Sequence, residues 1–67
     1  MIAIEVNGEA REVAPGCTVQ ELVGQLELAQ QQLALAVNRS VVPRQQWPQR
    51  ELRARDKVDI VRAIGGG

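Results

Sequence analysis

The sequence predicts an α+β fold, in which a mixed sheet of four to five strands carries one main helix packed on one face. Three observations predict it. The chain opens with two short apolar stretches separated by an Asn-Gly dipeptide, and a capped amphipathic segment follows them. Further short apolar runs fill the second half. The helix must therefore cross over from the opening hairpin to later strands, which favours a mixed sheet.

The first predicted element is a β-hairpin. Its opening strand, Ile2–Val6, alternates apolar residues with small or charged ones, as half-buried strands do. The Asn-Gly dipeptide that follows tolerates the positive φ angles of a two-residue turn. The returning strand, Glu9–Val13, places Arg11 on its inward face. We expect the aliphatic stem of Arg11 to lie along the core edge, with its charge in water.

The main helix is predicted to begin after a Pro-Gly turn and to end near Glu27 or Leu28. Thr18 and Glu21 form the Thr-x-x-Glu capping box, which satisfies the first free amides of a helix. Apolar residues then recur at the i, i+3, i+4 and i+7 positions of one stripe, which consists of Val19, Leu22, Val23 and Leu26.

The next two predicted strands follow the helix. Leu33–Val37 is an apolar run that periodicity alone assigns to helix or strand. We predict a strand, because a turn-prone Asn-Arg-Ser stretch and the β-branched pair Val41 and Val42 come next. Pro43 ends the second of these strands, because proline cannot donate a ladder hydrogen bond.

The last strand is predicted over residues 57–64. If it lies parallel to the opening strand, it is central in the sheet. Before it, residues 43–48 are predicted to be irregular, with one tight helical turn. Residues 49–55 are predicted to hold a short edge strand.

Composition favours a carrier or binding module over an enzyme. Sixty-seven residues make one domain with a thin core. We predict a folded domain over residues 1–64 and a flexible glycine tail over residues 65–67. Eight basic residues balance eight acidic ones, so nothing favours nucleic acid or an anionic membrane as a partner.

One cysteine and no histidine leave no internal disulfide and no metal site to expect. The N-terminus lacks a signal-peptide pattern, and no apolar run approaches membrane-spanning length. We therefore expect a cytoplasmic protein.

The chain ends in Gly65, Gly66 and Gly67. Glycine has no side chain to bury and loses the most backbone entropy on ordering, so this run builds no structure of its own. Directly after a strand, it predicts a mobile arm whose working group is the carboxylate of Gly67. Taken alone, the run fits a frayed terminus or a cloning remnant equally well.

The outward face of the last strand supplies candidate docking residues. A sheet covered by one helix has an open face, on which Val61 and Ala63 are expected to lie, with Arg62 beside them. Isolated exposed apolar residues are normal. Next to a reactive arm, they become candidates for binding a partner protein.

Several segments together resemble the ThiS-type sulfur carriers of thiamine biosynthesis, which have the ubiquitin-like β-grasp fold. They are the opening hairpin, the Gly-Cys-Thr-Val-Gln-Glu-Leu helix start, Leu-Ala-Val-Asn at 35–38, Val-Pro-Arg-Gln-Gln-Trp at 42–47 and the final Gly-Gly. They span nearly the whole chain in the family's order. The Ala-Val-Asn and Val-Pro-Arg-x-x-Trp motifs combined with the Gly-Gly end are fairly specific.

The resemblance implies a protein co-substrate that has no catalytic residue of its own and binds no cofactor. An E1-like adenylyltransferase of the ThiF type would use ATP to adenylate Gly67. A persulfide sulfur donor would displace AMP and leave a thiocarboxylate, whose sulfur a thiazole synthase of the ThiG type would take into the thiazole ring. Gly65 and Gly66 would let the arm thread a narrow channel.

Three other functions remain open from the sequence. The first is a sulfur carrier of another pathway, such as the small subunit of molybdopterin synthase. This chain is short for that family and lacks the proline-containing stretch often found before its glycines. The second is a ubiquitin-like modifier, which would form isopeptide bonds to lysine. The third is a β-grasp binding module with an idle tail.

Three further features are interpreted as structural. Cys17 precedes the helix cap, where a thiol can be acidified, but the chemistry needs an acyl group and not a thiol. Trp47, the single aromatic residue, is predicted to cover a sheet edge in preference to docking a partner. The arginines of the second half are interpreted as a solvated surface: Arg39, Arg44, Arg50, Arg53 and Arg55.

Overall fold

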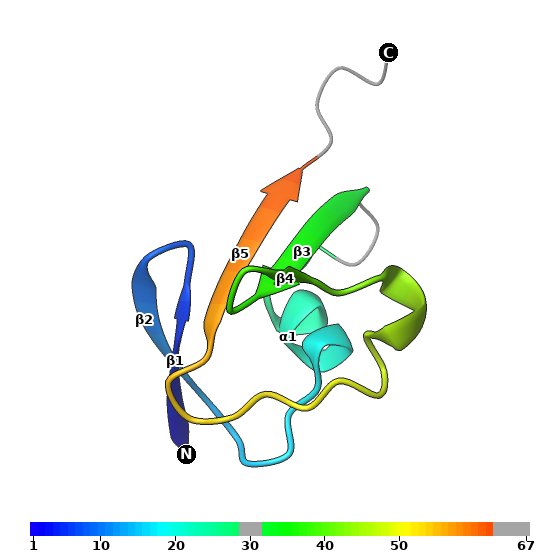
Figure 1. The fold of residues 1–67 in the computed structure, drawn as a ribbon. Coiled ribbons are helices and arrows are strands. Elements are labelled where there is room, and N and C mark those ends of the chain that lie inside the picture. The colour runs from blue at the N-terminus through cyan, green and yellow to red at the C-terminus, as the bar shows by residue number, and fades with distance from the viewer. Residues whose placement is uncertain (29–31, 63–67) are drawn as a thin grey trace.

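A computed structural model of the chain describes residues 1–28 and 32–62. This part of the chain forms one sheet with the strand order β2-β1-β5-β3-β4, together with one α-helix and one 3-10 turn (Figure 1). The elements are β1 Ile2–Val6, β2 Glu9–Val13, α1 Val19–Gln25, β3 Leu33–Val37, β4 Ser40–Val41, η1 Arg44–Gln46 and β5 Lys57–Arg62.

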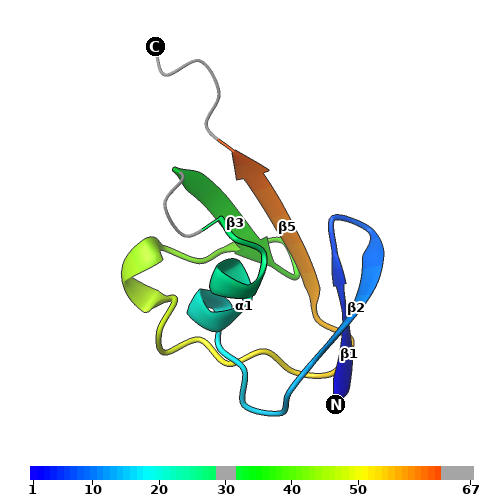
Figure 2. The same cartoon turned by 180° about the vertical axis from the view of Figure 1, so that it is seen from behind.

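The sheet is mixed, as predicted, and its central strand is β5. β5 runs parallel to β1, with Val58 opposite Val6, and antiparallel to β3, with Val58 opposite Val37. α1 packs on one face only, and Figure 2 shows it lying in front of the sheet. The other face carries no helix in the described part of the chain (Figure 1).

The β1–β2 turn also helps to hold β5. Asn7 and Gly8 have φ angles of 52° and 84°, the left-handed conformation that this turn requires. The Asn7 amide donates to the Val58 carbonyl at 2.8 Å, and the Asn7 Oδ1 atom accepts a hydrogen bond from the Ile60 amide at 2.8 Å. The Asn7 side chain therefore extends the β1–β5 ladder by one bond beyond the end of β1.

The start of α1 is the predicted capping box. Thr18 Oγ1 accepts from the Glu21 amide at 3.2 Å, and Glu21 Oε1 accepts from the Thr18 amide at 3.1 Å. These bonds satisfy amides that have no partner within the helix.

The predicted end of the helix was wrong by about two residues. The last helical residue is Gln25, and Glu27 adopts a left-handed φ of 60°. The Leu28 amide then bonds to the Val23 carbonyl at 3.1 Å, and the Glu27 amide bonds to the Gly24 carbonyl at 3.1 Å. This pair of bonds is a Schellman motif, usually built around glycine, which explains why the apolar stripe alone misplaced the end.

The core lies between α1 and the sheet. Leu22 and Val19 of α1 are fully buried, and they belong to the same apolar cluster as Leu35 of β3 and Val58 of β5. Trp47 is 3% exposed and donates its indole N–H to the Val42 carbonyl at 2.9 Å. Trp47 is thus a covering residue next to β4, as predicted, and is too buried to form a docking surface.

The segment between η1 and β5 departs from the prediction. The helical turn predicted within residues 43–48 is present as η1, but residues 49–55 form no edge strand. Glu51 makes only an isolated bridge with Thr18. The Leu52 amide bonds to the Cys17 carbonyl at 2.7 Å, so the segment pairs with the approach to α1 and not with the sheet.

A buried carboxylate fixes the start of β5. Asp56 is 8% exposed, and its two oxygens accept from Asn38 Nδ2 at 3.1 Å and from the Arg53 amide at 2.8 Å. The Asn38 Oδ1 atom accepts in turn from the Lys57 amide at 3.0 Å. These bonds tie the β3–β4 turn to the strand that leads to the glycines.

Candidate functional site

The reactive end predicted from the sequence lies outside the described residues. Ala63, Gly65, Gly66 and Gly67 all fall there. The structure does describe the strand that leads to them, up to Arg62. The site therefore consists of β5 and the surfaces on either side of it.

β5 is paired with neighbouring strands along its whole length. Its register with β3 runs without interruption from Val37 opposite Val58 to Leu33 opposite Arg62. On its other side, the Asp56 and Val58 carbonyls accept amides of β1 and of the turn after it. Arg62, the last described residue of β5, is thus still paired within the sheet.

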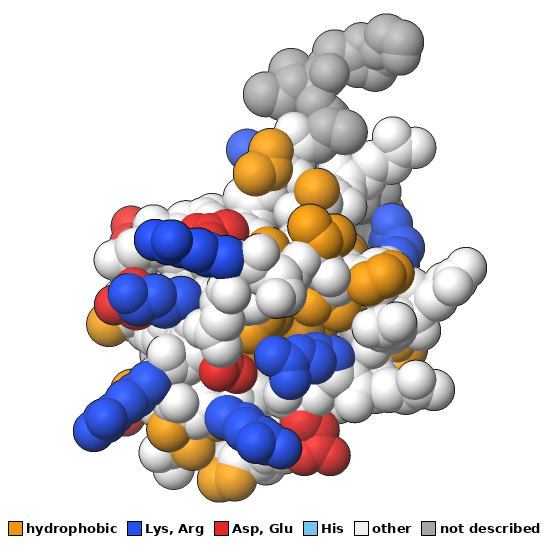
Figure 3. Space-filling model, viewed as in Figure 1, with side chains coloured by type: hydrophobic (Ala, Val, Ile, Leu, Met, Phe, Trp, Pro, Cys, Tyr) orange, Lys and Arg blue, Asp and Glu red, His pale blue; other side chains and the backbone are white. Residues whose placement is uncertain are grey.

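The open face of the sheet carries an apolar surface beside the end of β5. Val61 is 64% exposed, and Ala34 lies directly opposite it on β3. Val41 is 75% exposed, and Ala36 lies directly opposite it. Directly opposed residues share a face, so these four residues form one surface, which we call the sheet-face patch. Figure 3 shows hydrophobic side chains gathered over β5, β3 and β4.

Charged side chains of both signs adjoin the sheet-face patch. Lys57 and Asp59 lie on the same outward face of β5 as Val61, and both are exposed. Arg39 lies in the β3–β4 turn with a φ of 69° and is exposed too. The arrangement, an apolar centre with a charged margin, is typical of protein–protein interfaces.

Three members of this patch escaped the sequence prediction. Val61 was expected on the open face, whereas Val41, Ala34 and Ala36 were not. The alternation of Ala34 and Ala36 with buried Leu35 was a usable signal. Val41 gave no such signal, because only the register of β4 with β3 shows which of two adjacent valines faces outward.

Cys17 is a structural residue in this fold. It is 4% exposed, and its thiol donates to the Thr18 carbonyl at 3.5 Å. Burial raises the pKa of the Cys17 thiol, and the nearby carboxylate of Glu21 raises it further. The thiol is therefore not acidified at the helix start. Within residues 1–28 and 32–62, no cluster of three acidic, cysteine or histidine side chains has the geometry to hold a metal ion.

The arginines of the second half are mostly exposed, as interpreted from the sequence. Arg44 lies over the ring of Trp47, 5.1 Å from its centroid, which is cation–π geometry. None of the helices in the described part of the chain is long and apolar enough to cross a membrane.

The comparison with known proteins decides the family. The model of the ThiS family matches residues 4–67. The sulfur carrier protein ThiS of Escherichia coli (strain K12) is 41% identical over 61 residues, which cover 91% of this chain and 92% of that protein. The chain belongs to the ThiS family. The protein is a sulfur carrier of thiamine biosynthesis, as the resemblance implied, which decides against the molybdopterin synthase subunit and the ubiquitin-like modifier.

A solved structure supports the same assignment for the fold of this ThiS family member. The crystal structure of the thiamine biosynthesis protein ThiS from Geobacter metallireducens matches with a TM-score of 0.84 and 28% identity. The match covers 98% of this chain and 100% of that one. The predicted ubiquitin-like β-grasp fold is therefore confirmed.

A third relative is larger. A thiazole synthase of Paramagnetospirillum magneticum is 36% identical over 62 residues, which cover 92% of this chain but 19% of that enzyme. In that relative, the segment that is similar to this chain is one part of a much longer polypeptide.

Proposed function

We propose that the carboxylate of Gly67 is the group that carries the sulfur. An E1-like adenylyltransferase converts it to an acyl-adenylate with ATP. The persulfide of a sulfur donor displaces AMP, and cleavage of the sulfur–sulfur bond by a thiol leaves a thiocarboxylate. A thiazole synthase then takes the sulfur. Membership of the ThiS family supports this route, as does the position of Gly67 five residues beyond the anchored end of β5.

The route asks no catalytic group of this chain. A carboxylate is a poor electrophile, because its charge repels nucleophiles and oxide is a poor leaving group. Adenylation removes both obstacles, and the activating enzyme supplies the charge stabilisation. Burial of the Cys17 thiol, the one thiol of the chain, agrees with a passive role for the carrier. Because the route consumes ATP, we place it in the cytoplasm.

The sheet-face patch is the proposed docking surface for the adenylyltransferase. Ordering a flexible arm in an enzyme channel costs about 1–2 kcal/mol per residue, so separate contacts must offset that cost. Full burial of a valine side chain stabilises a complex by roughly 1.5 kcal/mol or more. Val61 and Val41 offer that surface. Of the other two predicted docking residues, Arg62 follows Val61 on β5 and so points to the opposite face, and Ala63 lies outside the described residues.

Intact mass spectrometry of the protein purified from cells that make thiamine tests this function. We expect a fraction of molecules in which one oxygen is replaced by sulfur, with the change located in the last peptide of the chain. A sulfur gain located at Cys17 would contradict the proposal. So would an unmodified Gly67 in cells whose thiazole formation depends on this protein.

The channel for the arm has its own test. Gly66→Ala adds one methyl group to the arm, so we expect it to slow adenylation in a pyrophosphate-release assay more than it weakens binding. A variant as active as the wild type would contradict a narrow channel.

A further inference from the structure

The two turns beside β5 hold that strand in the same way. The β1–β2 turn begins with Asn7 and the β3–β4 turn with Asn38, and both residues have a φ of 52°. The Asn38 amide donates to the Lys57 carbonyl at 2.7 Å, and the Asn38 Oδ1 atom accepts from the Lys57 amide at 3.0 Å. The Asn7 amide donates to the Val58 carbonyl, and its Oδ1 atom accepts from the Ile60 amide, both at 2.8 Å. Each asparagine thus gives β5 one donor and one acceptor, and the two lie on opposite sides of the strand.

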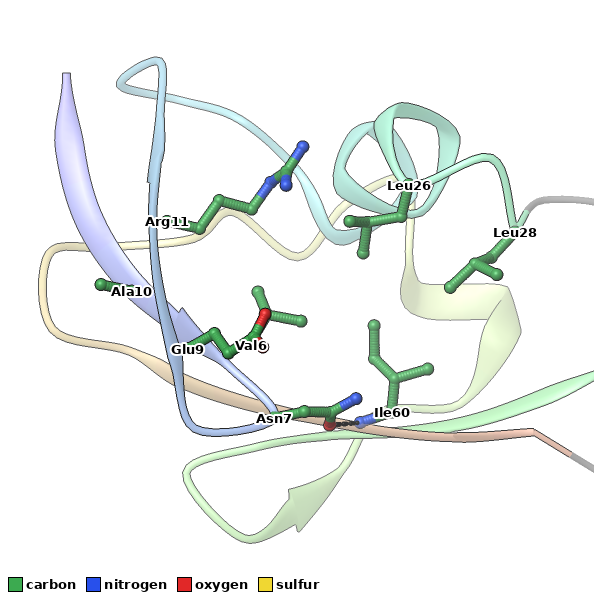
Figure 4. Close-up of a pocket in the computed structure, with 8 residues that line it drawn as sticks. All are labelled: Val6, Asn7, Glu9, Ala10, Arg11, Leu26, Leu28 and Ile60. Carbon is green, nitrogen blue, oxygen red and sulfur yellow. Dashed lines mark hydrogen bonds between the residues drawn. The ribbon is translucent and has the colours of Figure 1, made fainter.

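The two holds differ in what they add to β5. On the β3 side, pairing between the backbones continues along β5 to Arg62. On the β1 side, it ends at Val58, where β1 gives way to its turn. The Asn7 side chain carries the β1-side bonding on to Ile60, two residues nearer the arm, as the dashed line in Figure 4 marks. Asn38 therefore acts where β3 already pairs with β5, whereas Asn7 acts beyond the end of β1.

The Asn7 bond fixes β5 at a position that the core also fixes. A strand that is bonded on one side only can twist about that ladder, whereas bonds on both sides restrain it. Ile60 is 9% exposed and belongs to the apolar cluster under α1, while its amide points sideways to Asn7. The bond is part-buried, so water competes with it less than at the surface. Packing and the side-chain bond thus hold the same residue in two directions.

Few residues can fill the role of Asn7. A left-handed φ is strained for most residues that carry a Cβ atom, and asparagine and aspartate adopt it more readily than others. Glycine is not strained there, but it has no side chain that could accept from the Ile60 amide. The turn and the hold on β5 therefore make separate demands on position 7, which substitutions can separate.

The hold at Ile60 lies close to the base of the arm. Arg62, the last described residue of β5, comes two residues later. In the proposed function, the body of the carrier docks while the arm is drawn out along an enzyme channel. An extended arm passes a shift of its base on to its end, where the Gly67 carboxylate must meet the α-phosphate of ATP. A misplacement of reacting groups by about 1 Å costs up to about 100-fold in rate.

We propose that Asn7 is a positioning residue of the carrier, whose Oδ1 atom fixes β5 at Ile60 and so sets where the arm leaves the sheet. Asn7 acts through β5 and touches no reacting atom. The proposal rests on the proposed function, because it takes the arm to be the reactive part of the chain.

Three variants of the full chain separate positioning from stability. Asn7→Gly removes the acceptor without straining the turn, and Asn7→Asp keeps a side-chain oxygen at the same place. Gly8→Ala is the matched control, because alanine is strained at the φ of 84° in the same turn while the Asn7 side chain remains. Nothing lies within 4 Å of the Cβ atom that this control adds, so backbone strain is its main effect.

The measurement is kcat and KM of the adenylyltransferase for each carrier, by pyrophosphate release at a temperature where all variants are folded. We expect Asn7→Gly to lower kcat about tenfold and to change KM by less than about twofold, the pattern of a lost alignment and not of lost docking. Asn7→Asp should restore kcat to within about twofold of the wild type. Gly8→Ala should lower the unfolding temperature but leave kcat unchanged.

Hydrogen exchange of the Ile60 amide checks the bond itself, and it should be about tenfold faster in Asn7→Gly than in the wild type. Equal exchange in the two proteins would overturn the proposal. So would a wild-type kcat for Asn7→Gly, a kcat for Gly8→Ala that falls as far, or a failure of Asn7→Asp to restore it. If Asn7→Gly does not fold, Asn7→Ser replaces it, because the shorter serine side chain places no oxygen at the same point. A wild-type carrier that releases no pyrophosphate would instead count against the proposed function.

Discussion

The two faces of the sheet are built from the same strands but meet different surroundings. On β5, Val58 and Ile60 face α1 and are buried, whereas Val61 faces outward and is 64% exposed. On β3, Leu35 is buried beside exposed Ala34. One alternating pattern thus supplies both a core and an apolar outer surface. The covered face should govern stability and the open face should govern binding, so substitutions can separate the two.

Leu22→Ala should have the largest effect on the covered face. Leu22 is fully buried in α1, and replacing such a residue with alanine typically costs about 2–5 kcal/mol. A 67-residue domain has little stability beyond that, so we expect a large loss in chemical denaturation. Unchanged stability would show that α1 does not hold the sheet.

Asp56→Ala should have the next largest effect. It leaves Asn38 and the Arg53 amide without their buried acceptor, which costs on the order of 1–3 kcal/mol. Asp59→Ala is the control, because Asp59 is an exposed carboxylate three residues further along, within β5. Equal denaturation midpoints for the two variants would contradict a structural role for the Asp56 hydrogen bonds.

Val61→Asp should separate binding from stability. The side chain is exposed, so we expect the free energy of unfolding to change by less than about 0.5 kcal/mol. A carboxylate in the sheet-face patch should weaken binding to the adenylyltransferase by about tenfold, as measured by calorimetry. If affinity is unchanged, the open face is not the docking surface.

Glu27→Gly should have the smallest effect, and in the opposite direction. Glu27 holds a left-handed φ of 60° at the end of α1, where glycine is not strained. We expect the variant to gain up to about 1 kcal/mol of stability, measured by thermal unfolding with no change in binding. A clear loss of stability would mean that the Glu27 side chain makes contacts that outweigh its backbone strain.

Local patterns predicted most of this fold. The Asn-Gly turn, the capping box from Thr18 to Glu21 and the alternation in β1 each depend on neighbouring residues only. These features were therefore readable without coordinates. The helix crossover predicted the mixed sheet, but the parallel pairing of β5 with β1 was considered only as a condition, and the structure supplies it.

The wrong or missed predictions concern features that depend on pairing between residues far apart in the sequence. Residues 49–55 carry a weak strand pattern, but Glu51 and Leu52 pair with the approach to α1. The sheet-face patch depends on the register of β3 with β4 and β5, which sets Val41 beside Ala36. Only the alternation of Ala34 and Ala36 with Leu35 leaves a local mark of this patch in the sequence. Of the predicted site itself, only Val61 and Arg62 lie among the described residues.

Deletion of Gly67 tests the central claim most directly. Removing it moves the terminal carboxylate to Gly66 and shortens the arm by about 3.5 Å, while the described core is untouched. With the adenylyltransferase, ATP and a persulfide donor, we expect the full chain to gain one sulfur by intact mass and the truncated chain to gain none. Both should unfold at the same temperature. A truncated chain that still gains sulfur at the wild-type rate would contradict a sulfur carrier that acts through Gly67.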